Sequence, residues 1–144
     1  MRALAELADP RADSPLESMS RLRFLQLGLV PDIQVRVPGQ TGGELYLDFA
    51  FPRLGFWGEC DGKSKYTSSA LAGASSPAEI VYLEKRRQDW ITGTTKLRCV
   101  RWGVTEVLTL DRFAAHLRAH GISVPAQPSP LHTPGTARFL AALR

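Results

Sequence analysis

Three acidic residues lie in two strand-like segments whose spacing could bring their side chains together. Asp48 is in the middle of ELYLDFAFP, and Glu59 and Asp61 are two positions apart at the end of LGFWGECDG. Alternate residues of a strand share a face, so Asp48 can lie beside Glu59 and Asp61 if the strands pair. Gathered carboxylates repel one another unless a cation neutralises them, and oxygen ligands favour Mg²⁺ or Mn²⁺. The spacing is equally compatible with a metal site and with the solvent-exposed face of an antiparallel sheet.

A fourth acidic residue, Glu17, lies near the start of a helix-like segment. The run Ser14-Pro-Leu-Glu17 fits a capping box, in which the glutamate side chain bonds the backbone N–H of the N-cap residue. This capping role explains Glu17 without any function. The same side chain could also point from the helix toward the carboxylates, so the sequence leaves both roles open.

Basic residues follow the carboxylates along the chain. They lie directly after Asp61, on a later helix and on the strand beyond that helix: Lys63, Lys65, Lys85, Arg86, Arg87 and Arg98. Such residues are usually solvated, and that interpretation stays open. A nuclease site also needs cations that hold phosphates next to a metal that activates water. The order of charges therefore permits a nucleic-acid site.

Composition sets further limits. The chain has 144 residues, 44% hydrophobic and 22% charged, which is typical of one globular domain. The net charge of +4 permits a polyanionic partner without requiring one. The two cysteines lack metal-ligand spacing, and His116 and His120 fit a surface or core role better than a metal site. No apolar stretch is long enough to span a bilayer and no signal peptide is evident, so we expect no membrane partner and a cytoplasmic location.

The elements that must position the acidic residues alternate between helical and strand periods. The patterns predict helices over 14–28, 77–91 and 108–121, and strands over 32–38, 44–52, 54–62 and 96–102. Short turns make the first three strands antiparallel, and the helix before the fourth favours a parallel crossover. We therefore expect an α/β fold with an α+β mixed sheet of four strands, flanked by helices. Residues 14–121 would form this domain, residues 1–13 a linker-like remnant with a short helical turn, and residues 122–144 a proline-rich, extended tail with one helical turn at TARFLAALR.

Alternation also assigns side chains to faces of the sheet. In the second strand, one face would carry Leu45, Leu47, Phe49 and Phe51, and the other would carry Asp48. In the third strand, one face would carry Trp57, Glu59 and Asp61, and the other would carry Phe56, Gly58 and Cys60. A shared site requires Asp48 and Glu59 to lie close together, with Glu17 facing them.

Together these motifs resemble a known family. The combination runs from Ser14 to His120 and consists of S-P-x-E, L-D-F-A-F-P, G-E-C-D-G-K-S-K-Y, E-K-R-R-Q-D and R-C-V-R-W. It is similar to the small very-short-patch-repair-like endonucleases of the PD-(D/E)XK nuclease superfamily. The resemblance implies a restriction-endonuclease-like αβββαβ core and Mg²⁺- or Mn²⁺-dependent cleavage of phosphodiester bonds in DNA. Longer relatives of this type carry an N-terminal winged-helix or antitoxin-like region.

The resemblance also implies roles for single residues. Asp48 matches the first metal-binding aspartate, Glu59 the acidic member of the E-x-K half-motif, and Glu17 the helix-borne glutamate of many members. Asp61 stands where the superfamily has lysine and could assist in metal binding. The cationic role then falls to Lys65, Lys63 or Lys85, in that order.

The sequence thus favours a metal-dependent DNA endonuclease whose metal ligands are Asp48, Glu59 and Asp61. DNA would be held by Lys85, Arg86, Arg87 and Arg98, and a homodimer is one option. The alternative is a catalytically inactive nucleic-acid-binding module of a toxin–antitoxin or phage-defence protein. A structural or partner-binding domain without a nucleic-acid role is a further rival.

Overall fold

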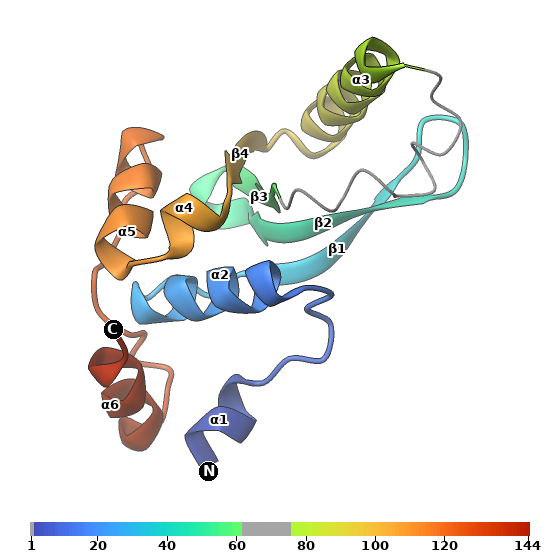
Figure 1. Cartoon of the computed structure of the whole chain (residues 1–144). Coiled ribbons are helices and arrows are strands. Elements are labelled where there is room, and N and C mark those ends of the chain that lie inside the picture. The colour runs from blue at the N-terminus through green and yellow to red at the C-terminus, as the bar shows by residue number, and fades with distance from the viewer. Residues whose placement is uncertain (1, 62–75) are drawn as a thin grey trace.

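A four-stranded mixed sheet forms the centre of the computed structural model, which describes residues 2–61 and 76–144 (Figure 1). Its strands lie in the order of the chain: β1 (Asp32–Pro38), β2 (Glu44–Phe51), β3 (Phe56–Cys60) and β4 (Arg98–Trp102). The first three strands pair antiparallel, and β4 pairs parallel with β3. This pairing confirms the mixed four-stranded sheet predicted from the turn lengths and the intervening helix.

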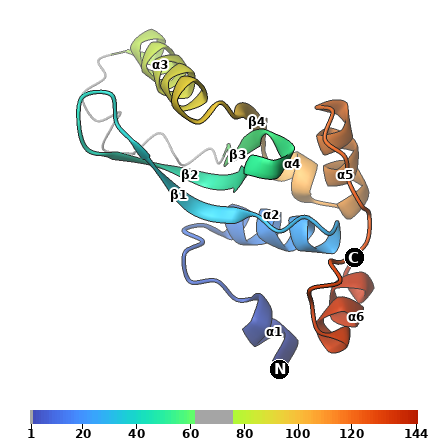
Figure 2. The same ribbon diagram turned by 180° about the vertical axis from the view of Figure 1, so that it is seen from behind.

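Helices cover both faces of this sheet (Figures 1 and 2). On one side, α2 (Pro15–Gln26) and α5 (Leu110–Ala119) enclose the larger apolar core, while α3 (Pro77–Thr95) lies on the other side. The short elements η1 (Pro52–Leu54) and α4 (Val104–Val107) connect neighbouring elements and were outside the sequence predictions. In the described part of the chain, no helix combines the length and apolar character that crossing a membrane requires.

The first helix of the domain, α2, begins where the sequence predicts. The Ser14 hydroxyl accepts the backbone N–H of Glu17 at 3.1 Å, and Pro15 occupies the first helical position. Phe24 on this helix is fully buried at the centre of the larger core. Its ring centroid lies within 5.3 Å of those of four other aromatic residues, Phe49, Phe51, Trp102 and Phe113. This cluster fixes α2 and α5 against the sheet.

Within the hairpin of β1 and β2, the regular alternation of side chains between the two faces of the sheet is interrupted. Leu47 packs with Trp57 and Ile91 on the α3 side, whereas Phe49 packs with Phe24 on the α2 side. The prediction that Leu47 and Phe49 share a face is therefore wrong. The change coincides with a backbone irregularity, because Gln34 on β1 has a φ of +50°. Asp48 lies at this point.

The helices at the two chain ends pack on α2, and both lie where the sequence predicts short helical turns. Helix α6 (Pro134–Ala142) forms within the proline-rich segment, capped by the Thr133 hydroxyl, and α1 (Arg2–Leu7) precedes the domain. Leu7, Leu25 and Leu140 make a small apolar cluster among these helices. Gln26 adds hydrogen bonds from its amide to the carbonyl oxygens of Leu140 and Leu143. The helical turn expected at TARFLAALR is therefore present and belongs to a longer helix than predicted.

Gly58 is required by the packing of two strands. A Cβ atom at Gly58 would overlap the six-membered ring of Trp102 on β4. We expect Gly58→Ala to lower the free energy of unfolding by about 1–3 kcal/mol, the usual cost of overpacking a core. Urea denaturation of the purified protein measures this change.

Gly93 provides the matched control for Gly58→Ala. It lies within α3 with open space around it, so a methyl group meets no neighbour. Gly93→Ala should raise the free energy of unfolding by about 1 kcal/mol because alanine favours the helix. Equal effects at the two glycines would contradict the packing seen around Trp102.

Candidate acidic site between the second and third strands

Asp48 and Glu59 lie near each other at the junction of β2 and β3. The antiparallel register ends at the pair Phe49–Gly58, Asp48 and Glu59 are the next residues beyond it, and the two carboxyl groups interact electrostatically. Oδ2 of Asp48 accepts the backbone N–H of Cys60 at 2.9 Å, which ties the carboxylate to the end of β3. The structure therefore brings together the two residues that the sequence singles out most strongly.

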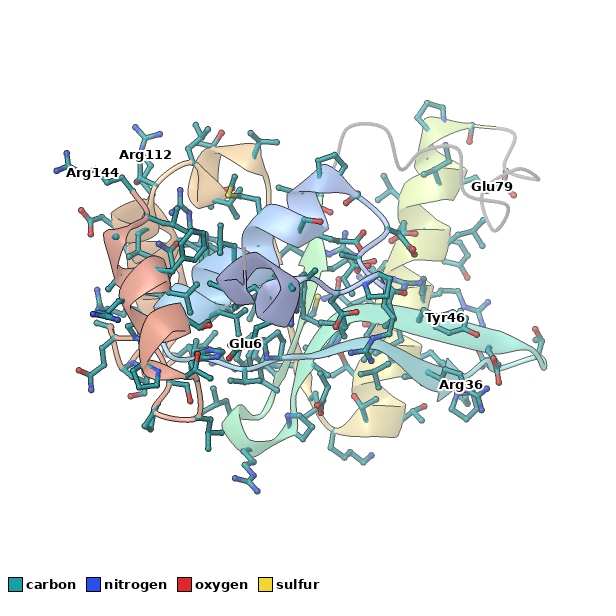
Figure 3. All side chains as sticks on the ribbon, turned by 90° about the horizontal axis from the view of Figure 1, so that it is seen from below. Glu6, Arg36, Tyr46, Glu79, Arg112 and Arg144 are labelled. Carbon is teal, nitrogen blue, oxygen red and sulfur yellow. The ribbon has the colours of Figure 1, made fainter. Side chains whose placement is uncertain are left out.

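Glu59 is held by two arginines from different elements. Its Oε1 lies 2.8 Å from Nη1 of Arg87 on α3, and its Oε2 lies 3.3 Å from Nη2 of Arg101 on β4. Arg87 also donates to the carbonyl oxygen of Tyr46 on β2 at 3.1 Å (Figure 3 labels Tyr46). The Glu59 side chain is mostly buried. The Arg87 guanidinium is therefore paired with Glu59 and is not simply a solvated cation on the surface of α3.

The surroundings of Glu59 disfavour its charged form. Burial raises the pKa of its carboxyl group above the ordinary 4.5, Arg87 and Arg101 oppose this rise, and Asp48 and Glu84 add to it. The contribution of Asp48 shows that the two carboxylates interact electrostatically. Within the described residues, Oε2 of Glu59 is buried without a hydrogen-bond partner, although it forms the ion pair with Arg101. Burial thus outweighs the two arginines in setting the direction of the Glu59 pKa.

This pKa predicts how Glu59 affects stability as the pH changes. A carboxyl group with a raised folded-state pKa contributes stability that is fully present below pH 4.5 and is lost as the pH rises through the raised value. We expect the free energy of unfolding of the wild type to fall more steeply across this range than that of Glu59→Gln. Urea denaturation at a series of pH values measures the two slopes, and identical slopes would refute the assignment.

Arg101 connects further acidic residues to the site. Its Nη1 lies 3.3 Å from Oδ1 of Asp61, and its Nη2 lies 3.4 Å from Oε2 of Glu84. Asp61 is exposed and follows β3 directly, on the Glu59 side as alternation predicts. The sequence interpretation left Arg101 out of the site. The parallel register of β3 and β4 pairs it with Glu59, and this register could not be read from the local pattern.

Glu17 reaches the same region through a side chain on β1. Its buried carboxylate accepts the Ser14 hydroxyl at 3.2 Å and the Asp13 backbone N–H at 2.9 Å. The expected capping bond to the backbone N–H of Ser14 is replaced by these two contacts. Nε2 of Gln34 also donates to Glu17 at 3.2 Å. Gln34 on β1 and Asp48 on β2 both lie between the paired residues Ile33–Phe49 and Val35–Leu47. The hydrogen bond from Gln34 therefore connects Glu17 to the part of the hairpin that carries Asp48.

The remaining predicted site residues lie apart from the carboxylates or outside the described part. Lys63 and Lys65 are outside the described residues. Lys85 and Arg86 are exposed on α3, and the Arg86 guanidinium lies 5.9 Å from the centroid of the Tyr82 ring. Arg98 begins β4 and pairs with Phe56, at the other end of β3 from Glu59.

His116 has a structural contact in this fold. A ring nitrogen, Nε2, lies 2.8 Å from the carbonyl oxygen of Arg101, and the ring lies beside that of His120. This contact joins α5 to β4 at the backbone of Arg101, whose side chain is paired with Glu59. His116 is half-buried, and this contact gives it a structural role.

The donor atoms at the site fit magnesium in type. Asp48 and Glu59 supply carboxylate oxygens, and Oε2 of Glu59 is buried with an ion pair to Arg101 but without a hydrogen bond among the described residues. Within residues 2–61 and 76–144, no group of three or more His, Cys, Asp or Glu side chains is arranged to hold a metal ion. An ion at this position would therefore depend on two carboxylates and on water, which is an ordinary arrangement for Mg²⁺.

Comparisons with known proteins add no relative. No protein-family model, curated protein or solved structure matches the chain significantly.

Proposed function

We propose that the chain is a metal-dependent DNA endonuclease with a restriction-endonuclease-like αβββαβ core. The observation that carries the proposal is the interaction of Asp48 with the end of β3, where its carboxylate accepts the Cys60 N–H and acts electrostatically on Glu59. The mixed four-stranded sheet with helices on both faces is compatible with such a core. The motifs that resemble very-short-patch-repair-like endonucleases include both of these residues.

Two carboxylates are sufficient for the proposed chemistry. Asp48 and Glu59 would hold Mg²⁺ or Mn²⁺, and exposed Asp61 lies near enough to Arg101 to belong to the same charged group. When bound, such an ion supplies an activated water and neutralises charge on a phosphate. The chain's own residues orient the carboxylates: Cys60 N–H holds Asp48, and Arg87 holds Glu59.

Basic residues on α3 support nucleic acid as the substrate. Lys85 and Arg86 are exposed on the same helix that sends Arg87 to Glu59. Backbone phosphates would find cations there, and such contacts contribute affinity that falls as salt increases. Lys63, Lys65 and Lys85 remain the candidates for the lysine of the superfamily pattern.

One observation favours a second function. Because Glu59 is already paired with Arg87 and Arg101, the site can persist without a metal ion. A catalytically inactive nucleic-acid-binding module would keep these ion pairs and the basic helix. It would not need the affinity for a divalent cation that the nuclease requires.

A cleavage assay separates the two functions. Supercoiled plasmid, linear duplex, mismatched duplex and single-stranded DNA would be incubated with the wild type in Mg²⁺, in Mn²⁺ and in excess chelator. The nuclease predicts cutting of at least one form that stops with chelator. Salt-sensitive binding without cutting in any ion would support the binding module. Absence of both binding and cutting would overturn both nucleic-acid functions.

A further inference from the structure

The helices at the two chain ends enclose a pocket against α2. It lies among α1, α2 and α6, which Figure 2 shows together at one end of the molecule. Its volume is about 490 Å³, within the range of about 300–1,000 Å³ that small-molecule sites usually have. None of the described residues that line it belongs to the acidic site. The pocket is therefore a separate feature of the fold.

Most of the pocket lining is apolar. Leu7 on α1 and Leu25 on α2 are buried, while Leu22, Phe139 and Leu143 are half-buried along the pocket. These side chains come from all three helices and leave a gap between them that is open to water. A ligand gains about 4-fold in affinity for each methylene group that it buries in such a gap. The lining thus favours a ligand with a hydrocarbon chain.

One charged side chain, that of Arg21 on α2, belongs to the described lining. It lies one helical turn after Ser18, an exposed residue that also lines the pocket, and its own side chain is 19% exposed. Its Nη1 donates to the carbonyl oxygen of Leu7, the last residue of α1. Its Nε lies 3.9 Å from Oδ2 of Asp9, which is a long ion-pair contact. The apolar pocket therefore has one cationic edge.

The Asp9 carboxylate is held more closely by Arg11 than by Arg21. Its Oδ1 accepts Nε and the backbone N–H of Arg11 at 3.0 and 3.1 Å, and its Oδ2 accepts Nη2 of Arg11 at 2.8 Å. The side-chain hydrogen bond from Arg11 is the main reason that the pKa of Asp9 is lowered to about 2. Burial lowers the pKa of Arg21, because its guanidinium is partly removed from water. An anion in the pocket would restore to Arg21 a close partner of opposite charge.

The single charge of Arg21 suits a carboxylate. The planar donors of a guanidinium match the two oxygens of a carboxylate, in a paired arrangement that a lysine cannot make. One guanidinium balances the one negative charge of a carboxylate, whereas a phosphate monoester carries about −1.5 to −2 charges at neutral pH. A linear carboxylic acid therefore complements both the apolar lining and the cationic edge.

We propose that the pocket among α1, α2 and α6 binds a medium-chain carboxylic acid. Its hydrocarbon chain would lie against Leu22, Leu25 and Phe139, and its carboxylate would accept hydrogen bonds from Arg21. A ligand in this position contacts all three helices, so its binding stabilises the packing of the chain ends on α2. This inference goes beyond the proposed function and does not depend on a cation at the acidic site.

Calorimetric titration of the full chain tests both parts of the ligand. Hexanoate, octanoate and decanoate would be titrated below their micelle concentrations, and the affinity should rise about 16-fold for each two methylene groups added. Octanol tests the headgroup, because it has the same chain length as octanoate without the charge. Arg21→Gln should weaken octanoate binding at least about 10-fold, the usual effect of a hydrogen bond to a charged group, and leave octanol binding unchanged.

Two further variants control for charge and for folding. Arg53→Gln removes the same charge at an exposed position of η1, so it should bind octanoate like the wild type. Ala8 is exposed and lines the pocket, so Ala8→Phe should occupy the space and weaken octanoate and octanol alike. It also leaves Arg21 in place, which keeps the test decisive if Arg21→Gln is unstable. Circular dichroism melting shows whether each variant is folded.

Each contrary result removes a defined part of the inference. Unchanged octanoate affinity in Ala8→Phe would overturn the pocket as the site, and unchanged affinity in Arg21→Gln would overturn the carboxylate contact. Equal affinities for hexanoate and decanoate would overturn the apolar contact. Tighter binding of octyl phosphate than of octanoate would overturn the carboxylate as the headgroup. A dimer in analytical ultracentrifugation that Leu22→Glu converts to a monomer would assign the pocket to a second copy of the chain instead.

Discussion

Asp48→Asn is expected to abolish Mg²⁺-dependent DNA cleavage while leaving the chain folded. Asparagine has the shape of aspartate, and its Oδ1 can still accept the N–H of Cys60. The substitution removes a negative charge that acts on Glu59 and with it one of the proposed cation ligands. Loss of an outer-shell partner already costs roughly 10- to 100-fold in activity or metal affinity, so loss of a direct ligand should cost more than about 100-fold. The initial rate of nicking of a supercoiled plasmid measures the effect.

Asp111→Asn is the control for this prediction. Asp111 is exposed in the first turn of α5, away from the acidic site, and the substitution changes the net charge by the same amount. The nicking rate of Asp111→Asn should equal that of the wild type. If Asp48→Asn also cuts at the wild-type rate, Asp48 is not a ligand of the reactive centre.

Phe24→Ala should produce the largest loss of stability from a single side chain. Phe24 is fully buried and contacts four aromatic rings from β2, β4 and α5. Its removal loses apolar burial and leaves a cavity that neighbouring rings cannot readily fill. Such substitutions lower the free energy of unfolding by about 3–5 kcal/mol. Urea denaturation monitored by tryptophan fluorescence measures the change, since Trp102 lies against Phe24.

A surface position provides the comparison for Phe24→Ala. The side chain of Leu131 is 87% exposed, so Leu131→Ala should change the free energy of unfolding by no more than about 0.5 kcal/mol. A loss below about 1 kcal/mol for Phe24→Ala would show that this aromatic cluster does not form the core of the domain.

Much of the sheet could be predicted from the sequence because its signals are local. Alternation marks β1 to β4, and the Ser14 cap with Pro15 marks the start of α2. In β3 the predicted faces are confirmed, since Trp57 packs on the α3 side and Phe56 on the α2 side. These features depend on residues that are close in the chain.

Other features depend on contacts that the local pattern does not encode. The alternation of side chains on β2 is interrupted at Asp48, beside the position where Gln34 on β1 has a positive φ. Arg101 reaches Glu59 only through the parallel register of strands about 40 positions apart, and α6 forms where it can pack on α2. The pairing of Glu59 with two arginines, in particular, is a product of tertiary structure.

The claim that Asp48 and Glu59 share one divalent cation is tested most directly by a calorimetric titration of Mn²⁺. The titration would compare the wild type with Asp48→Asn at neutral pH and without DNA. We predict that the wild type binds one Mn²⁺ per chain and that Asp48→Asn loses this binding. Equal Mn²⁺ binding by the two proteins, or no binding by the wild type, would contradict the claim.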